Sequence, residues 1–209
     1  MSTLDGAASR AWVEAFLGAA ERDVTALGDL DRRAGDGDFG TNLTTSVNAA
    51  RRVLADGDAA LPAAAFAALS TAFLGTGGTS GPLYGMFFRE LGKAAGDQPA
   101  IDLPTLAAGV VAGVDAVCRL GGAEVGEKTM VDALRPAADA LAAAADAGAP
   151  LDGALADAAR AARAGSDTTA TLVARRGRAT YVGDAASGVT DPGAAAVALF
   201  FEAAVANHL

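Results

Sequence analysis

The stretch VEAFLGAAERDVTAL, residues 13–27, decides the fold class of this chain. Its apolar residues recur every three or four positions, so that one side of a helix is apolar while the other side is charged. The residues on the apolar side are Val13, Phe16, Leu17, Ala20, Val24 and Leu27. This pattern predicts an amphipathic helix over residues 4–27.

The same spacing returns along the rest of the chain, whereas the alternation typical of strands is nearly absent. Only residues 179–182 read as extended, and Pro136 falls inside one of the helical stretches. The pattern predicts one all-α domain over residues 1–209, with about eight antiparallel amphipathic helices in a barrel or bundle. The further helices are expected over residues 41–55, 62–73, 82–91, 104–120, 129–147, 151–164 and 194–207. Whether the helix over 151–164 continues after Gly165 through residues 166–174 is left open.

The amino-acid composition of the chain excludes several classes of function. The chain is 52% hydrophobic and only 5% aromatic, with much alanine, which favours a core of close-packed helices. Its 25 acidic and 16 basic residues give a net charge of −9, which argues against binding to nucleic-acid phosphates. Cys118 is the only cysteine and His208 the only histidine, so an internal disulfide, a Cys/His zinc site and catalysis by histidine are not expected. With no apolar run of about 20 residues and no signal-peptide pattern, we expect a cytoplasmic protein.

A loop rich in aspartate and glycine, LDRRAGDGDFG at residues 30–40, lies between the first two predicted helices. Three confined carboxylates, Asp31, Asp36 and Asp38, repel one another unless a cation neutralises them, and their oxygens suit Mg²⁺ or Ca²⁺. A solvated turn is the alternative, because Asp and Gly are common turn residues. An EF-hand is excluded, because the position that would carry its bidentate Glu holds Val47.

Three further stretches carry candidate binding residues. Residues 75–85, GTGGTSGPLYG, combine glycines and hydroxyls before a helix, which favours an anion cradle or a simple helix junction. Residues 121–132, GGAEVGEKTMVD, resemble a P-loop, but Glu127 separates Gly126 from Lys128 and no strand precedes them, so a Walker A motif is rejected. Residues 177–194 supply an arginine and a Pro-Gly turn that opens the last helix.

Together these four stretches resemble the nucleotide-binding L subunit, or L domain, of the dihydroxyacetone kinases. That family carries a GDGD-type loop, a GG-x-SGPLYG loop, a G-x-KTM-x-D stretch and a GRA-x-Y…DPGA tail, in the order found here between Leu27 and Ala194. The resemblance implies a barrel of eight antiparallel helices that binds ADP or ATP through loops at one end. It implies two Mg²⁺ ions on Asp31, Asp36 and Asp38. The nucleotide contacts that it implies are Phe39, Gly40, Thr41, Asn42, Thr79, Ser80, Gly121, Met130, Arg178, Asp191, Pro192 and Gly193.

One position departs from the family, whose members usually have histidine where this chain has Phe39. Phenylalanine cannot donate a hydrogen bond to the nucleotide or orient an aspartate. The resemblance therefore leaves nucleotide binding intact and puts the phosphoryl-transfer step in doubt.

The resemblance also implies partners. In the family, dihydroxyacetone is held covalently by a histidine of a K subunit or domain, which this chain cannot supply because its only histidine is His208. We therefore expect a glycerone kinase-type phosphotransferase subunit that needs a K partner. A chain of 209 residues favours separate subunits in which a phosphotransferase-system M subunit recharges bound ADP.

Other readings stay open at this point. The chain fits an ATP-dependent L subunit for another small keto-sugar, a nucleotide-sensing regulatory module without turnover, or a helical protein whose acidic loops are only solvated. The oligomeric state, a homodimer included, is left open.

Overall fold

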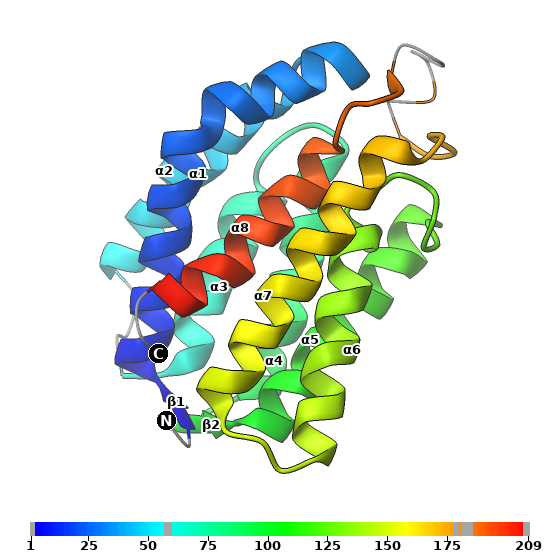
Figure 1. The fold of residues 1–209 in the computed structure, drawn as a ribbon. Helices are drawn as coiled ribbons and strands as arrows, with labels where there is room; N and C mark the ends of the chain where they lie inside the picture. The colour runs from blue at the N-terminus through cyan, green and yellow to red at the C-terminus, as the bar shows by residue number, and fades with distance from the viewer. Residues whose placement is uncertain (1–2, 57–59, 178–179, 181–185, 207–209) are drawn as a thin grey trace.

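The computed structural model describes residues 3–56, 60–177, 180 and 186–206. Each helix in this part of the chain packs on the next one in sequence, and α8 packs on α1, so that the helices close into a barrel (Figure 1). The predicted all-helical fold is confirmed. The eight helices are α1 (Gly6–Ala34), α2 (Phe39–Asp56), α3 (Pro62–Leu74), α4 (Ser80–Ala95), α5 (Leu103–Gly121), α6 (Val131–Asp146), α7 (Leu151–Thr168) and α8 (Pro192–Ala206).

Successive helices run antiparallel, and this alternation sorts the connecting segments into two sets, one at each end of the barrel (Figure 1). The segments after α1, α3, α5 and α7 lie at one end of the barrel, the upper end in Figure 1. These are the segments that the sequence singled out for their aspartates, glycines and hydroxyls. The barrel therefore brings together four stretches that are far apart in the chain.

A short antiparallel pair of strands lies at the opposite end, which the sequence did not predict. Strand β1 (Thr3–Asp5) pairs with β2 (Ala100–Asp102). The side chain of Asp5 accepts a hydrogen bond from the Ala8 amide at 2.8 Å, and Asp102 accepts one from the Thr105 amide at 3.0 Å. Each strand thus ends on the residue that caps the following helix, α1 or α5. Three-residue strands are too short to show a period of two.

One predicted boundary changes, and one predicted extended stretch lies mostly outside the described residues. Of the stretch 179–182, which was expected to be extended, only Thr180 lies among the described residues. Helix α1 continues to Ala34, so Asp31 lies on its last turn and not in the loop where it was predicted. Arg32 and Arg33 stabilise this extra turn, because cations interact favourably with the C-terminal end of a helix dipole.

Helices α6 and α7 approach each other closely at Pro136 and Gly165. Pro136 lies within α6, where it has no N–H to offer the carbonyl of Asp132 four residues earlier. Gly165 of α7 lies against that carbonyl, and a Cβ atom on it would come within 2.1 Å of the Asp132 oxygen. α7 continues through Gly165 to Thr168, short of residue 174, and is followed by a 3₁₀ turn, η1 (Thr169–Thr171).

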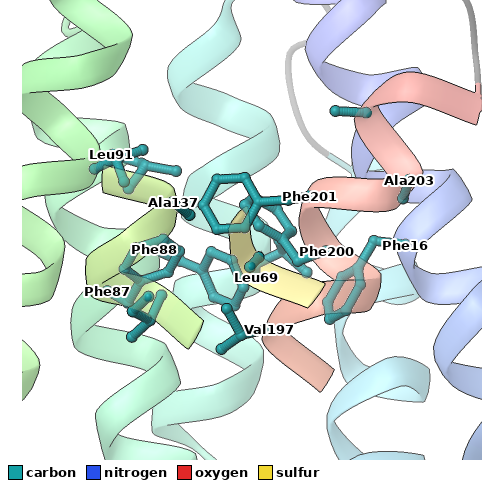
Figure 2. Packing of buried hydrophobic residues seen from close by; sticks show 14 of the residues in the cluster. Phe16, Leu69, Phe87, Phe88, Leu91, Ala137, Val197, Phe200, Phe201 and Ala203 are labelled. Carbon is teal, nitrogen blue, oxygen red and sulfur yellow. The ribbon is translucent and has the colours of Figure 1, made fainter. Parts of the chain in front are cut away.

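The core is organised around aromatic rings that meet on α8. Phe200 stacks on Trp12 of α1 at 4.6 Å between ring centroids, and the Trp12 indole donates a 2.7 Å hydrogen bond to the Phe200 carbonyl. Phe88 and Phe87 of α4 reach the other edges of Phe200, at 5.1 and 6.0 Å (Figure 2). Because these rings come from α1, α4 and α8, they hold the two halves of the barrel together.

Helix α5 is long and apolar enough to cross a membrane by length and composition, with a mean hydropathy of 1.5 over its 18-residue window. Half of that window is buried inside the protein, and α5 packs between α4 and α6. A core helix passes the same test, and it is the only helix among the described residues that does so.

The contact between α6 and α7 generates a prediction about stability. Gly165→Ala should lower the free energy of unfolding by about 1–3 kcal/mol, because the new methyl group overlaps a backbone carbonyl that cannot move freely. Gly153→Ala on the same helix is the control, since its Cβ meets nothing within 4 Å. It should raise stability by about 0.5 kcal/mol, because alanine favours the helix. Urea unfolding of both variants is the measurement, and equal effects would contradict the close approach.

Candidate functional site

The upper end of the barrel holds a pocket of about 180 Å³ that is open to solvent on one side. All four segments at this end contribute to its wall. The predicted residues that line it are Asp31, Asp36, Asp38, Phe39, Asn42, Thr79, Ser80, Gly121, Met130, Asp191, Pro192 and Gly193.

Two predicted residues do not line the pocket, and a third is outside the part of the chain that the structure describes. A Cβ on Gly40 would come within 3.3 Å of the Gly28 Cα, so Gly40 serves the close crossing of α1 and α2 and does not line the pocket. Thr41, in the first turn of α2, is exposed and is not part of the wall either. Arg178 lies outside the described residues.

Several wall residues were not predicted as contacts. Gly78 belonged to a stretch noted for its glycines, whereas Leu83 and Val117 looked like ordinary core residues. Lys128 was not predicted as a contact, because the P-loop that it resembled was rejected. Arg176 precedes the predicted Arg178 by two residues in the sequence. A glycine in a Gly-rich loop could have been found from the sequence, but an apolar residue that faces a pocket has no distinct signal.

Four helices begin at this end of the barrel, and their first residues line the pocket. Phe39 opens α2, Ser80 opens α4, Val131 opens α6 and Pro192 opens α8. Backbone N–H groups in the first turn of a helix lack partners within that helix and favour an anion. The amides of Phe39, Val131 and Ala194 already donate hydrogen bonds within the protein, and Pro192 has no N–H. The positive ends of four helix dipoles still lie at this pocket, which favours a ligand with negative charge.

One end of the pocket is acidic. Asp31 is buried, and its Oδ2 accepts a 2.9 Å hydrogen bond from the Phe39 amide, which links α1 to the start of α2. Burial raises the pKa of Asp31, and the charges of Asp36 and Asp38 raise it further. Gly35 makes room for this carboxylate, because a Cβ there would come within 2.1 Å of Asp31 Oδ1. The local chemistry favours a cation beside these groups.

The three aspartates are not gathered as a finished metal site. Among the described residues, no three His, Cys, Asp or Glu side chains lie close enough together to hold a metal ion. The donor set still fits Mg²⁺, because all three carboxylates line one pocket and the negative charges of Asp36 and Asp38 raise the Asp31 pKa. The metal site therefore stays a prediction.

Next to the acidic end, the loop before α4 meets the start of α2. The backbone φ angle of Gly78 is +85°, a value that favours glycine. A Cβ at this position would come within 2.6 Å of the Asn42 side-chain amide. Thr79 and Ser80 follow directly and line the pocket with their hydroxyl-bearing side chains. This loop and the first turn of α2 thus form one continuous polar wall.

The other end of the pocket is apolar. Its wall includes Leu83 of α4, Val117 and Gly121 of α5, and Met130. A Cβ on Gly121 would lie 3.4 Å from the Leu83 side chain, so glycine keeps this space open. A ligand with one charged end and one flat, apolar end would match the two ends of the pocket.

Polar contacts fix the segment before α8. The Asp191 side chain accepts a 2.7 Å hydrogen bond from the Ala194 amide and so caps α8, while the Asp191 amide donates to Thr169 Oγ1 at 2.8 Å. Burial raises the pKa of Asp191 to about 7. The Tyr84 hydroxyl donates a 2.6 Å hydrogen bond to the carbonyl of Gly193. These contacts hold the Asp-Pro-Gly turn against α4 and α7.

Lys128 is buried and ties two segments together. Its amine donates to the backbone carbonyls of Thr169 and Val189, and its φ of +63° is rare for a residue with a side chain. Burial lowers the pKa of this amine, and the nearby Asp191 opposes that shift. In a P-loop the lysine reaches phosphates, whereas here its hydrogen bonds go to the backbone of the wall.

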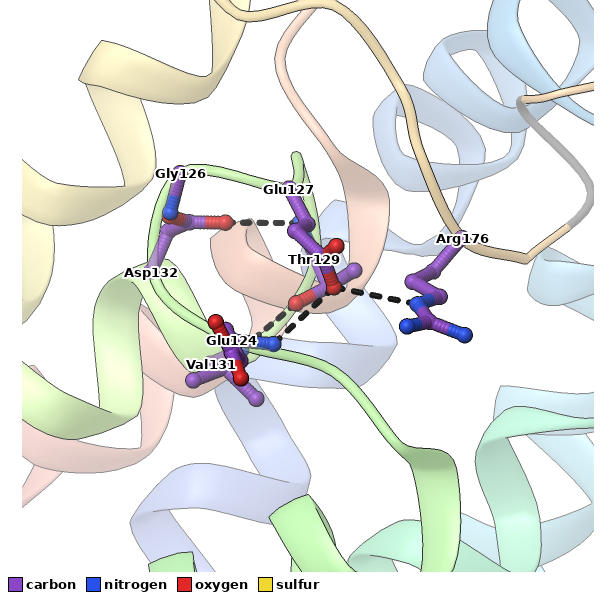
Figure 3. Close-up of polar contacts among 7 residues, drawn as sticks. All are labelled: Glu124, Gly126, Glu127, Thr129, Val131, Asp132 and Arg176. Atoms are coloured by element: carbon purple, nitrogen blue, oxygen red, sulfur yellow. Dashed lines mark hydrogen bonds and ion pairs between the residues drawn. The ribbon is translucent and has the colours of Figure 1, made fainter.

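The loop before α6 is held by two carboxylates (Figure 3). Asp132 accepts hydrogen bonds from the amides of Gly126 and Thr129, at 2.5 and 2.8 Å. Glu127 accepts one from the Glu124 amide at 3.0 Å and one from Arg176 Nε at 3.1 Å. The second contact reaches across to the segment that follows α7.

Comparison with known proteins adds a family. Residues 33–206 match the DAK2 domain model. The ADP-binding subunit DhaL of PEP-dependent dihydroxyacetone kinase 1 from Listeria innocua is 32% identical over 193 residues, which are 92% of this chain and 91% of that protein. The L-erythrulose 1-kinase of Mycolicibacterium smegmatis is 37% identical over 203 residues, 94% of this chain but 34% of that protein.

The fold is similar to that of a solved kinase. The crystal structure of the dihydroxyacetone kinase from C. freundii in complex with AMP-PNP and Mg²⁺ matches with a TM-score of 0.71 and 30% identity, over 95% of this chain and 33% of that one. The chain thus spans about a third of this kinase and of the erythrulose kinase, and nearly all of the Listeria subunit.

The raised pKa of Asp191 predicts how stability changes with pH. Between the unfolded pKa of about 3.9 and the folded value of about 7, the folded protein binds more protons than the unfolded chain, so stability falls as pH rises through this window. Asp191→Asn does not titrate, and its amide oxygen can still accept from Ala194. Urea unfolding without nucleotide or metal should therefore show a smaller loss of stability in the variant between about pH 4.5 and about pH 7.5. Parallel losses would contradict the assignment.

Proposed function

The chain belongs to the DAK2 domain family, and from that premise we propose that it is the nucleotide-binding part of a dihydroxyacetone-type kinase. It holds ADP or ATP with Mg²⁺ and passes the phosphoryl group to dihydroxyacetone, or a similar small keto-sugar, on a K-type partner. The observation that carries this proposal is a single pocket with an acidic end, four helix starts and an apolar end. These features suit the metal ions, the phosphates and the base of a nucleotide.

The polar wall of the pocket is where we propose that the nucleotide phosphates bind. The loop at Gly78, Thr79 and Ser80 and the first turn of α2 offer backbone N–H groups and hydroxyls, which favour phosphate oxygens. Phosphoryl transfer depends mainly on positioning and on neutralising charge, so rigid donors around the phosphates are what such a site needs. The name of the Listeria relative, an ADP-binding subunit, supports this use of the pocket.

The acidic end of the pocket is where we propose that the metal ions bind. Asp31, Asp36 and Asp38 would hold Mg²⁺, and we propose two ions on this set. When bound, the ions neutralise phosphate charge that a protein of net charge −9 would otherwise repel. The glycines at 35 and 37 let the backbone bring the carboxylates of Asp36 and Asp38 towards Asp31. The solved relative that contains AMP-PNP and Mg²⁺ supports this use.

The acceptor sugar requires a partner. The described pocket wall contains carboxylates, hydroxyls, one lysine and one arginine, and the lysine is occupied by backbone carbonyls. His208, the only histidine in the sequence, lies outside the described residues. We therefore propose that a K-type subunit or domain binds the sugar. We also propose that the reaction takes place in the cytoplasm.

The phosphoryl donor has two candidates. The Listeria relative is named as PEP-dependent, which favours bound ADP that a phosphotransferase-system M subunit recharges. Direct use of ATP is the second candidate, and the name of the L-erythrulose 1-kinase favours a different keto-sugar as the acceptor. We propose the first arrangement, with ADP as a resident cofactor.

Nucleotide binding should depend on Mg²⁺ and on the aspartates. Asp36→Ala removes one carboxylate from the acidic end and should abolish Mg²⁺-dependent binding of ADP in calorimetry, with the circular dichroism of the helices unchanged. Asp97→Ala, in an exposed position between α4 and β2 and outside the pocket, is the matched control. Wild-type protein should gain about 2.7 kcal/mol of stability from ADP at a hundredfold excess over its dissociation constant. Equal ADP binding by Asp36→Ala and wild type would refute the metal assignment.

Phe39 generates a second prediction. Its ring is 8% exposed and lines the pocket beside Asp31, where it adds apolar contact of about 1–2 kcal/mol. The hydrogen bond of a histidine there is worth about 0.5–1.5 kcal/mol, so Phe39→His should leave ADP affinity nearly unchanged. We expect the rate of phosphoryl transfer with a K-type partner to change instead. A large gain in ADP affinity at unchanged turnover would show the reverse.

A further inference from the structure

Glu127 links the loop before α6 to the segment after α7 through two contacts. Its carbonyl accepts a 3.1 Å hydrogen bond from the Arg175 amide, and its Oε2 contacts Arg176 Nε at 3.1 Å. Glu127 is half-buried, and the hydrogen bonds from the Glu124 amide and Arg176 lower its pKa, so the carboxylate is charged. Glu127 is the residue that breaks the P-loop pattern, and here it fixes the position of an arginine (Figure 3).

The position of Arg176 is at the apolar end of the pocket. Its guanidinium NH1 lies 3.8 Å from where a Cβ on Gly122 would be, next to Gly121 in the wall. Leu83, Val117 and Met130 form the rest of this end, whereas the aspartates and the hydroxyl-bearing loop form the other. The Arg176 side chain is 51% exposed, so much of its surface remains available to a ligand.

We propose that Arg176 forms the outer wall of the base end of the pocket and that its planar guanidinium stacks on the nucleobase. This inference rests on the proposed function, since it assigns the base end of the same site. A guanidinium stacks on aromatic faces, and the ion pair with Glu127 sets its orientation and offsets its charge. Glu127 is then a positioning residue, which acts on the base through Arg176.

A contact between Arg176 and the phosphates is the competing role. It would place the cation among the helix starts and the aspartates, whereas the guanidinium forms its ion pair with Glu127 and lies beside Gly122. The two roles differ in what they require of the side chain. Stacking needs a flat group and a base, whereas a phosphate contact needs only a positive charge.

The test compares two probes, Mg²⁺-ADP and Mg²⁺-pyrophosphate, by calorimetry. Arg176→Ala should weaken ADP binding about five- to tenfold and leave pyrophosphate binding within about twofold of wild type. Arg176→Lys keeps the charge but not the flat group, and should weaken ADP binding nearly as much. Arg51→Ala is the control, because Arg51 is a similarly exposed arginine in an ion pair with Glu21 at 3.0 Å, outside the pocket.

A double-mutant cycle tests the role of Glu127. Glu127→Gln should weaken ADP binding in the wild type and have little further effect in the Arg176→Ala background. A purely structural role for Glu127 predicts the same loss in both backgrounds and would overturn the positioning role.

The remaining outcomes separate this inference from the function on which it rests. Equal weakening of ADP and pyrophosphate, full ADP affinity in Arg176→Lys, or unchanged affinity in Arg176→Ala would each overturn the stacking role alone. A wild-type protein that binds no Mg²⁺-ADP would overturn the proposed function together with this inference.

Discussion

The alternating direction of the eight helices is the constraint on which the rest of the structure depends. Because each helix runs antiparallel to the one before it, α2, α4, α6 and α8 all begin at the same end of the barrel. The closure of α8 on α1, with Phe200 among rings from α1 and α4, fixes this arrangement. Four stretches of sequence that carry polar and glycine residues are thereby brought to one pocket, which none of them could form alone.

Internal contacts hold the wall of that pocket before any ligand arrives. The Lys128 amine ties the loop before α6 to the backbone after α7, Asp132 holds that same loop, and Asp191 caps α8. A charged group is costly to bury without a partner, and each of these side chains has hydrogen-bond partners in the pocket wall. These hydrogen bonds hold the segments of the wall in place. A site that is already ordered loses little conformational entropy on binding, which suits a nucleotide held as a resident cofactor.

Apolar periodicity predicted the helices and their number, because an amphipathic helix leaves a clear pattern over many residues. It could not show that Asp31 belongs to α1, since a charged last turn reads like a loop, or that three-residue strands pair at the far end. Most predicted contacts gather around the pocket because their motifs fix the local backbone. The sequence could not show that Gly40 allows the close crossing of α1 and α2. It also could not show the contacts of Lys128 and Arg176, because their partners are more than 40 residues away in sequence.

The central claim is that this chain holds the nucleotide while a partner holds the sugar. The most direct measurement is phosphoryl transfer to dihydroxyacetone, followed with the purified chain alone and then with a K-type subunit added. The account predicts no transfer by the chain alone, and transfer that requires both proteins and the nucleotide. Turnover of dihydroxyacetone by the rigorously purified chain without a partner would contradict it.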